Sequence, residues 1–436
     1  MSEERVMEGY KQTEVGVIPE DWNFDTLGSL DPYVTSGSRG WAQYYSKFGD
    51  AFIRITNLDR ASIDIDLSDL KHVLIPDGDS EGQRTELRNG DILISITADI
   101  GIIGYVDDSV PKPAYINQHV SLVRFEPDET DSRFVAYFLA SEHVQSLFVG
   151  ATDQGAKAGI NLETVRQIRV ALPPLDEQKA IASTLSDIDN LLASLDRLIA
   201  KKRDLKQATM QQLLTGKKRL PGFGEGKGYK TTEHGTIPED WSLIEVGKVC
   251  GFIVPGRNKP SHFDGSIPWI TTPDLTDGGV VSSSKLELHI SPEEAKSVGS
   301  KIVPENSVLM SCVGDLGIVA LTQREIVVNQ QLHAFIPPKD ISPVFLMSAL
   351  QFRKTYIYSV ATITAVPYLN KDNCNSIPIA FPDYSEQIAI AQVLTDMDTE
   401  LTTLQTRRAK TQALKQAMMQ ELLTGKTRLL PPTANA

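Results

Sequence analysis

A long internal repeat dominates what this chain can fold into. Residues 9–22 (GYKQTEVGVIPEDW) recur as residues 228–241 (GYKTTEHGTIPEDW), with eleven of fourteen positions identical. Further along, Glu177-Gln178 recurs as Glu386-Gln387, and the pentapeptide Leu-Leu-Thr-Gly-Lys occurs at residues 213–217 and again at 422–426. A period of this length is a whole domain and not one supersecondary unit, which excludes a solenoid. The chain is therefore a tandem duplication.

The stretches between the matching blocks diverge and retain only a weak similarity. Asp91–Ser95 corresponds to Ser307–Ser311, and Asn117-Gln118 corresponds to Asn329-Gln330. We expect the two globular parts to share a fold and to differ in surface, as two readers of different targets need.

Within these parts the sequence predicts short strands joined by turns, and one amphipathic helix in each. Strand-like runs rich in β-branched residues occur at 52–56, 91–95 and 120–125. Apolar residues at helical spacing predict a single helix over Arg133–Phe148 and a counterpart over Val344–Tyr358. This mixture indicates an α+β domain.

Two uninterrupted stretches predict long helices. No proline or glycine occurs from Glu177 to Thr215 or from Glu386 to Thr424, and apolar residues alternate at spacings of three and four, as in a coiled-coil seam. The predicted seam residues are Ile181, Leu185, Ile188, Leu192, Leu195, Ile199, Ile390, Leu394, Met397, Leu401 and Leu404. The second half of each seam is polar, so parallel pairing would bury Lys206 near Lys415, and antiparallel pairing is also imperfect. Because duplicated halves tend to pair isologously, we predict antiparallel helices.

The expected fold is α+β, with two globular domains separated by two long antiparallel coiled-coil helices in a pseudo-two-fold tandem repeat. We place the first globular domain at residues 1–174 and the first long helix at 175–217. A linker and the second globular domain occupy 218–383, and the second helix and a tail occupy 384–436.

The net charge of −13 argues at first sight against nucleic-acid binding. The distribution is uneven, because residues 1–174 hold 28 acidic and 15 basic residues, whereas residues 175–230 hold 7 and 11. Non-specific attraction to phosphates is therefore not the main source of any affinity for DNA, and partners would supply much of the positive surface.

Two loops in each globular part carry side chains suited to DNA: the first candidate loop is 35–47 and the second 150–161, with counterparts at 255–262 and 362–370. Arginine pairs bidentately with guanine, and asparagine or glutamine with adenine. The candidate DNA-binding residues are Arg39, Trp41, Gln43, Tyr44, Lys47, Asn57, Lys157 and Asn161 in the first part, and Arg257, Asn258, Lys259, His262, Thr271, Thr272 and Asn370 in the second. Solvated loops with buried aromatic rings remain an equally open interpretation.

The sequence shows no complete catalytic, metal or membrane motif. Cys250, Cys312 and Cys374 are scattered, which predicts reduced thiols and no zinc site. Gly425-Lys426-Thr427 lacks the upstream glycine of a phosphate-binding loop. No apolar run is long enough for a membrane span and no signal peptide is expected, so we expect a cytoplasmic, non-catalytic protein.

The repeated Ile-Pro-Glu-Asp-Trp motif, Leu172-Pro173-Pro174-Leu175 with Glu177-Gln178, and the two Leu-Leu-Thr-Gly-Lys segments resemble the specificity subunits of type I restriction-modification systems. Ser36–Trp41 and Asn117-Gln118 also resemble that family. The second domain departs from the first, because it has no aromatic cluster like Trp41, Tyr44 and Tyr45.

The resemblance implies two target-recognition domains that read a bipartite site in double-stranded DNA. It implies helices that space these domains and dock two modification (methyltransferase) subunits, with restriction subunits joining separately. AdoMet, ATP and Mg would then be bound by the partner subunits, and no cofactor by this chain. The alternative is a coiled-coil scaffold or adaptor that binds only proteins.

Overall fold

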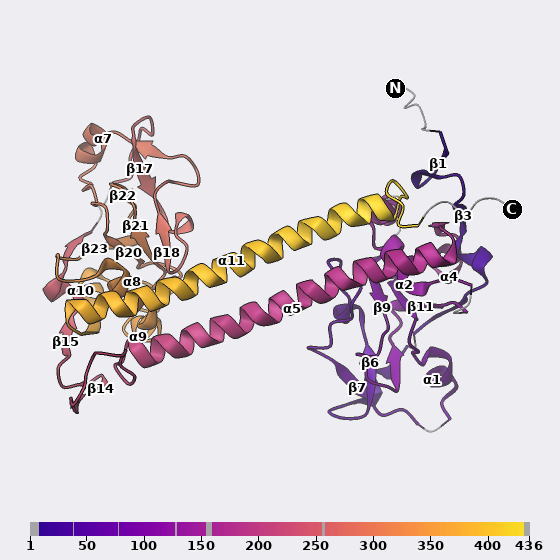
Figure 1. The fold of residues 1–436 in the computed structure, drawn as a ribbon, viewed down its shortest axis with the longest axis horizontal. Coiled ribbons are helices and arrows are strands. Elements are labelled where there is room, and N and C mark those ends of the chain that lie inside the picture. Colours follow the sequence, from indigo (N-terminus) through magenta and orange to yellow (C-terminus); the bar gives the residue numbers. More distant parts are fainter. Residues whose placement is uncertain are drawn as a thin grey trace. The chain divides into compact units, whose positions relative to one another are not determined.

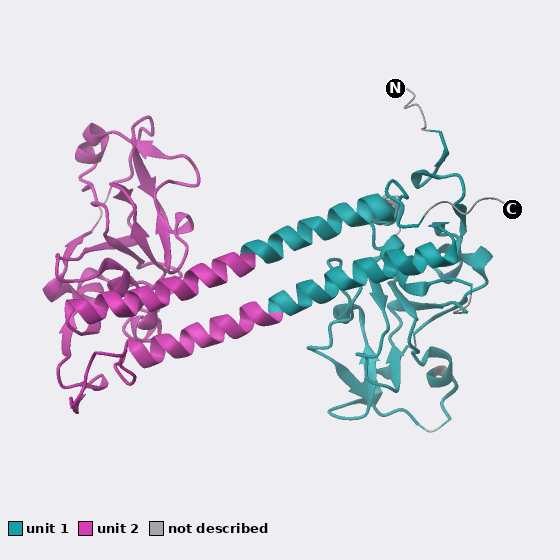
Figure 2. Ribbon diagram, in the orientation of Figure 1, with its two compact units in different colours: residues 1–196, 406–436 teal, residues 197–405 magenta. Residues whose placement is uncertain are grey.

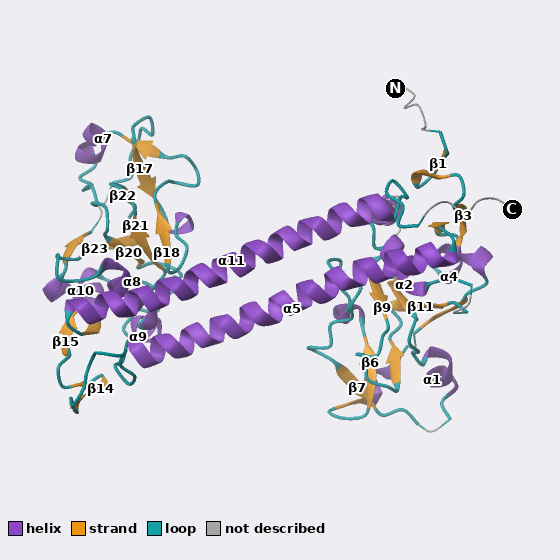
Figure 3. Ribbon diagram, viewed as in Figure 1, coloured by secondary structure: helices purple, strands orange, loops and turns teal. Residues whose placement is uncertain are grey.

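The computed structural model describes residues 8–37, 39–76, 78–126, 129–153, 159–254 and 258–430. It divides into two compact units, the first made of residues 1–196 and 406–436 and the second of residues 197–405 (Figure 2). Each unit therefore combines one mixed α/β region with a part of both long helices, coloured by secondary structure in Figure 3.

The first unit contains two four-stranded sheets. One has the order β4 (Tyr33–Ser36), β11 (Val120–Arg124), β8 (Ile92–Ser95), β9 (Ile103–Tyr105), and the other the order β10 (Ala114–Ile116), β6 (Asp50–Ile53), β7 (Lys71–Val73), β5 (Tyr45–Ser46). A hairpin of β1 (Tyr10–Thr13) and β2 (Gly16–Pro19) begins the unit, and β3 (Asn23–Thr26) pairs with β12 (Arg169–Leu172). The short helices are η1 (Leu27–Leu30), η2 (Trp41–Tyr44), η3 (Ile55–Asn57), α1 (Ser80–Thr85), α2 (Ser132–Leu139), α3 (Glu142–Asp153) and α4 (Leu162–Arg166).

The second unit repeats this plan with sheets of five and three strands in place of four and four. Its hairpin is β13 (Tyr229–Thr232) with β14 (Gly235–Pro238), and β15 (Ser242–Glu245) pairs with β24 (Pro378–Phe381). The larger sheet has the order β16 (Gly251–Ile253), β23 (Leu332–Ile336), β20 (Val308–Ser311), β21 (Val319–Thr322), β18 (Gly279–Val281). The smaller sheet has the order β19 (His289–Ile290), β17 (Ile267–Ile270), β22 (Val327–Val328). The short helices are α6 (Val246–Val249), η4 (Thr272–Asp274), α7 (Pro292–Ser297), α8 (Pro343–Phe352), α9 (Lys354–Ser359) and α10 (Lys371–Asn375).

The predicted single helix over Arg133–Phe148 is wrong, because the chain forms α2 and α3 with a break at Ala140-Ser141. No helix-breaking residue marks this point. The amide of Gln145 donates to the carbonyl of Leu139 at the end of α2 and to the carbonyl of Gly101, at 2.8 Å each. The Gln145 side chain thus satisfies a carbonyl at the end of α2 and connects the break between the helices to the loop at Gly101. The counterpart over Val344–Tyr358 is likewise divided into α8 and α9.

The two long helices are α5 (Leu175–Leu213) and α11 (Tyr384–Leu422), drawn in magenta and yellow in Figure 1. In the first unit Asp189 pairs with Lys415 (2.6 Å) and Asp196 with Arg408 (2.9 Å). As the residue number rises along α5, it falls along α11, so the predicted antiparallel pairing is confirmed. The second unit has the same direction, with Lys202 bound to Glu400 (2.6 Å) and Lys206 to Asp398 (2.5 Å).

These ion pairs explain the polar half of each seam. Lys206 and Lys415 do not face each other, because antiparallel pairing places each opposite an aspartate, Asp398 and Asp189. The tyrosine hydroxyl of Tyr137 in α2 donates to Asp189 at 2.7 Å and thereby links the helix pair to the first mixed region.

The apolar ends of the helices belong to the cores of the units. Ile181 and Leu185 of α5 and Met419 and Leu422 of α11 lie in the main core of the first unit. The second core takes the opposite ends: Met210 and Leu213 from α5 with Leu214 directly after it, and Ile390, Ala391 and Leu394 from α11. Burial of such side chains, at about 1.5–3 kcal/mol each, holds the helices in the units.

Each Leu-Leu-Thr-Gly-Lys segment packs against the Ile-Pro-Glu-Asp-Trp motif of the other sequence copy. Gly216, with φ +68°, follows α5 and lies so close to Pro238 that a Cβ would stand 2.4 Å from its ring. Gly425, with φ +67°, has the same relation to Pro19 at 2.5 Å. Only glycine meets both requirements without strain, which accounts for its presence in both copies.

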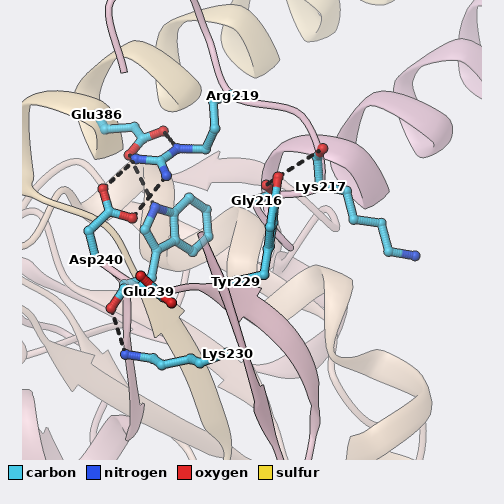
Figure 4. A network of polar contacts seen from close by, with 9 residues as sticks. Gly216, Lys217, Arg219, Tyr229, Lys230, Glu239, Asp240 and Glu386 are labelled. Atoms are coloured by element: carbon cyan, nitrogen blue, oxygen red, sulfur yellow. Dashed lines mark hydrogen bonds and ion pairs between the residues drawn. The ribbon is translucent and has the colours of Figure 1, made fainter. Parts of the chain in front are cut away.

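A polar network completes each of these contacts, and Figure 4 shows the one in the second unit. Arg219 binds Asp240 through two bonds of 3.0 Å and Glu386 through bonds of 2.5 and 2.7 Å, and the tyrosine hydroxyl of Tyr229 donates to the carbonyl of Gly216 at 3.1 Å. The first unit builds the same network from Arg428, which binds Asp21 (2.9 Å) and Glu177 (2.7 and 2.8 Å).

Among the described residues, no helix is both long enough and apolar enough to cross a membrane.

Candidate nucleic-acid interface

In the first unit, three segments that are distant in sequence meet at the end of β8. Ile96, which follows this strand, donates from its N–H to the carbonyl of His119 and accepts at its carbonyl from the N–H of Ile160, both at 2.9 Å. Gly37, which follows β4, donates to the carbonyl of Val120 at 3.0 Å. The start of the first candidate loop, the turn at residues 117–119 and the second candidate loop are thus brought together.

The contact between Gly37 and the 117–119 turn is too close for any side chain. A Cβ on Gly37 would stand 2.1 Å from the carbonyl oxygen of Asn117. The side-chain oxygen of Asn117 accepts from the N–H of His119 at 3.3 Å, which closes the turn and leaves Gln118 and His119 half-exposed.

The second unit builds the same junction from different residues. Cys312, which follows β20, donates from its N–H to the carbonyl of Gln331 (2.8 Å) and accepts from the N–H of Leu369 (2.9 Å). Asn329 closes the equivalent turn by accepting from the N–H of Gln331 at 3.1 Å. Thr272 of η4 donates its hydroxyl to the side-chain oxygen of Gln331 at 3.2 Å, so the candidate segment 271–272 also reaches this junction.

The two asparagine-led turns, 117–119 and 329–331, were not among the predicted contact residues. Their recurrence in otherwise divergent stretches was the signal that could have identified them. In the second unit, Gln330 and Gln331 are exposed on this turn.

The first candidate loop separates into buried aromatic and exposed polar side chains. Trp41 is buried, stacked on Phe52 at 5.7 Å between ring centroids and in edge contact with Tyr115 at 5.4 Å. Tyr44 is half-buried against the same cluster. The aromatic residues fix the loop to strands β6 and β10 through apolar burial and ring contacts.

Three polar residues of this loop extend into solvent: Arg39, Gln43 and Lys47 are exposed. Within the part of the chain that the structure describes, their side chains make no hydrogen bond or ion pair. They are available to a ligand, and arginine and glutamine have the donor geometry for base edges.

Several other candidates complete turns and helix starts. Asn57 is buried, accepts from the N–H of Arg54 (3.0 Å) and donates to the carbonyl of Asp66 (2.8 Å). Thr271 donates its hydroxyl to Asp274 at 2.7 Å. Asn161 and Asn370 cap α4 and α10 by accepting from Thr164 N–H (2.7 Å) and Asn373 N–H (2.8 Å).

The remaining candidates lie on the exposed loop of the second unit or outside the described residues. Asn258, Lys259 and His262 are exposed. The N–H groups of Ser261 and His262 donate to Glu294 and lower the pKa of that carboxyl group. Lys157 and Arg257 lie outside the described residues.

A buried histidine lies behind the second interface. His333 of β23 is stacked on Phe252 at 5.7 Å and lies tilted against Phe335 at 4.7 Å, and its ring nitrogen contacts the side-chain oxygen of Asn375 at 3.1 Å. Burial lowers the pKa of His333 to about 4, so the ring is neutral at pH 7.

No group of three or more histidine, cysteine, aspartate or glutamate side chains within the described ranges is placed to hold a metal ion. The arrangement offers exposed donors on rigid turns and suits recognition.

The family model of the type I restriction modification DNA specificity domain matches residues 67–201 and 238–415. The chain belongs to this family. It is 26% identical over 434 residues to the type I restriction enzyme MjaX specificity subunit of Methanocaldococcus jannaschii, covering 97% of each chain. It is 25% identical over 241 residues to the EcoR124I/EcoR124II specificity subunit of Escherichia coli, covering 53% of this chain and 56% of that one. The solved S subunit from M. genitalium shares the fold, with a TM-score of 0.56 and 15% identity over 92% of this chain and 96% of that one.

As a type I specificity subunit, the chain recognises the DNA target and assembles with the modification and restriction subunits, in which the catalysis of type I systems lies. The resemblance inferred from the repeated motifs is thereby confirmed, and the protein-only scaffold is not the function.

Proposed function

We propose that the two mixed regions read the two parts of a bipartite site in double-stranded DNA, one region to each part. The observation that supports this proposal is the junction at Ile96 and its counterpart at Cys312. The same backbone hydrogen bonds hold both turns, but the side chain after the glutamine differs, the half-exposed His119 in the first unit and the exposed Gln331 in the second. A shared frame with different polar side chains is what two readers of different base sequences require.

In the first region, Arg39, Gln43 and Lys47 contact DNA directly, and Trp41 and Tyr44 hold their loop in place. In the second region, the contacts come from Asn258, Lys259 and His262 together with the Thr272–Gln331 contact. The caps Asn57, Thr271, Asn161 and Asn370 shape these surfaces.

Helices α5 and α11 set the spacing between the two parts of the site and dock two modification subunits, and restriction subunits join this complex. The AdoMet site belongs to the modification subunits, and ATP with Mg belongs to the restriction subunits. Methylation requires the target adenine to leave the stack, which the modification subunit performs.

Exchange of one region tests the proposal. Residues 23–172 are replaced by the matching segment of a relative with a known, different target, and methylated sites are mapped by methylation-aware sequencing in cells that carry the full system. The expected result is a change in one part of the site, with the other part and the spacer retained. A matched exchange of residues 242–381 should change only the other part. Methylation that changes in both parts, or in neither, after a single exchange would contradict the proposal.

A further inference from the structure

Three large apolar side chains are exposed together on the first unit. Tyr45, Phe48 and Leu74 are 48%, 70% and 51% exposed. Phe48 is the only phenylalanine in the described part of the chain whose side chain is exposed, whereas the ring of Tyr45 also makes an edge contact with the buried Phe52 at 5.8 Å.

These side chains are held together by the edge of the sheet β10-β6-β7-β5. Tyr45 of β5 lies opposite Val73 of β7, and the N–H of Leu74 donates to the carbonyl of Tyr44 at 2.9 Å. Phe48 is at the tip of the turn between β5 and β6, where its N–H donates to the Ser46 hydroxyl at 3.3 Å.

The turn itself is closely packed. Gly49 has a φ of +121°, and a side-chain carbon of Leu74 lies 3.0 Å from the position that a Cβ would occupy. The stacked Trp41 and Phe52 rings support the strands. The apolar tip is therefore carried on a rigid base.

The surroundings of the tip differ in charge from the rest of the first unit. Residues 33–49, which lead up to the tip, contain Arg39 and Lys47 and no aspartate or glutamate; Asp50 follows the tip, and the exposed Asp69 pairs with Lys71 of β7. Elsewhere this unit is acidic, with 28 acidic and 15 basic residues over 1–174. The tip directly follows Lys47 and continues the loop of the exposed Arg39 and Gln43, so an apolar side chain adjoins groups that suit DNA, in which charged phosphates flank an apolar stack of bases.

We propose that Phe48, supported by Tyr45 and Leu74, is a wedge that enters a base-pair step beside the part of the site read by the first unit and unstacks it. This inference rests on the proposed reading of one part of the site by each unit. A phenylalanine inserted into a step replaces base–base contact with base–aromatic contact and kinks the duplex. Unstacking next to the target adenine lowers the cost at which the modification subunit flips that base.

The second unit has no equivalent wedge. At the corresponding place, Phe263 is half-buried and its ring packs against Trp269 at 5.3 Å. The wedge therefore acts on one part of the site only, which gives the proposal an internal control.

The test uses the full chain assembled with its modification subunits on duplexes that carry 2-aminopurine at successive positions across both parts of the site. A fluorescence increase of about threefold or more is expected at one step beside the part that responds to exchange of residues 23–172. Phe48→Ala should abolish this increase and weaken specific binding about tenfold, and Phe48→Leu should retain much of both. Leu286→Ala removes the most exposed large apolar side chain of the second unit (74% exposed) and should leave the signal unchanged.

Specific binding without any unstacking beside the first part would overturn the wedge and leave the reading proposal intact. An increase that persists in Phe48→Ala would assign the unstacking to the modification subunit alone and would also overturn it. Loss of modification subunits from the Phe48→Ala chain in the absence of DNA would show that the tip contacts protein, which again contradicts the wedge.

Discussion

At the scale of single residues, neighbouring side chains of the first candidate loop have different roles. Trp41 is buried against Phe52, whereas Arg39 and Gln43 stay in solvent two residues away on either side. Substitution of the buried Trp41 should therefore lower stability, whereas substitution of the exposed Arg39 or Gln43 should lower discrimination between DNA sequences.

Arg39→Ala should weaken binding to the specific duplex by about 10- to 100-fold, because a bidentate contact to a base contributes roughly 1–3 kcal/mol of discrimination. Binding to a scrambled duplex should change by less than about threefold, and the thermal unfolding midpoint should stay within about 1 °C of the original, since the side chain is exposed. Fluorescence anisotropy at fixed salt measures both affinities. Arg39→Lys is the matched control, since it keeps the charge and loses the paired donors. Equal losses on both duplexes would indicate a phosphate contact.

His333 should make the second unit sensitive to acid. Its pKa is lowered to about 4 by burial, below the ordinary value of 6.5. A lowered folded-state pKa means that the contribution to stability is complete above pH 6.5 and is lost as the pH falls from 6.5 towards 4, because the unfolded chain takes up the proton first. The full effect is on the order of 3 kcal/mol.

His333→Gln can still donate to Asn375 and cannot titrate, so its free energy of unfolding should fall less between pH 7.5 and pH 5 than that of the original chain. Urea unfolding of both chains at the two pH values measures the difference. If the free energy of unfolding fell equally in both chains, His333 would not be the cause of the acid sensitivity.

The sequence predicted which loops carry polar side chains but not which side chains are free. Asparagine and threonine recognise bases with the same atoms that cap helices, so Asn57, Asn161, Thr271 and Asn370 were reasonable candidates on residue type alone. Their hydrogen bonds to nearby backbone and side-chain groups are visible only in three dimensions.

At the scale of elements, the long helices were predictable because their signal is local. Apolar spacing and the absence of proline and glycine over 177–215 and 386–424 specify α5 and α11 to within two residues at each end. The break between α2 and α3 was not predictable, since it depends on the contact of Gln145 with a distant carbonyl at Gly101. The antiparallel direction of the helix pair was only partly predictable from the sequence, because it depends on which aspartate faces each seam lysine.

Lys415→Ala should destabilise the first unit by about 3–5 kcal/mol, because it leaves Asp189 as a buried charge without its cation. The side chains of this pair are only 4% and 9% exposed. The equivalent Lys206→Ala should cost about 1 kcal/mol, since Asp398 is 41% exposed and water screens it.

The triple variant Tyr137→Phe, Asp189→Leu and Lys415→Met should recover most of the loss, as apolar side chains replace the buried pair and no tyrosine hydroxyl is left without its acceptor. Urea unfolding of the three variants measures the differences. Equal losses for Lys415→Ala and Lys206→Ala would show that burial does not decide the strength of these pairs.

At the scale of the whole molecule, the two copies of the repeat are joined by contacts in which a motif of one copy binds a different motif of the other. In each unit, an arginine that follows the Leu-Leu-Thr-Gly-Lys segment of one copy binds the aspartate of Ile-Pro-Glu-Asp-Trp in the other. The motifs that recur in the sequence are thus the two sides of one joint. The segments near both ends of the chain meet in the first unit, where Tyr10 donates its hydroxyl to the carbonyl of Gly425 at 3.0 Å.

The joint can be opened separately in each unit. Arg428→Met leaves the carboxylate of Glu177, which is 2% exposed, without its cation, and should weaken the first unit by on the order of 3 kcal/mol. Hydrogen exchange followed by mass spectrometry should then show faster exchange in the peptide covering residues 10–22, with residues 229–241 unchanged. Arg219→Met is the matched control, because it removes the same partner from Glu386 and should produce the opposite pattern. If either variant loosened both hairpins to the same extent, the two joints would not act independently, and the division of the chain into two separately stabilised units would be wrong.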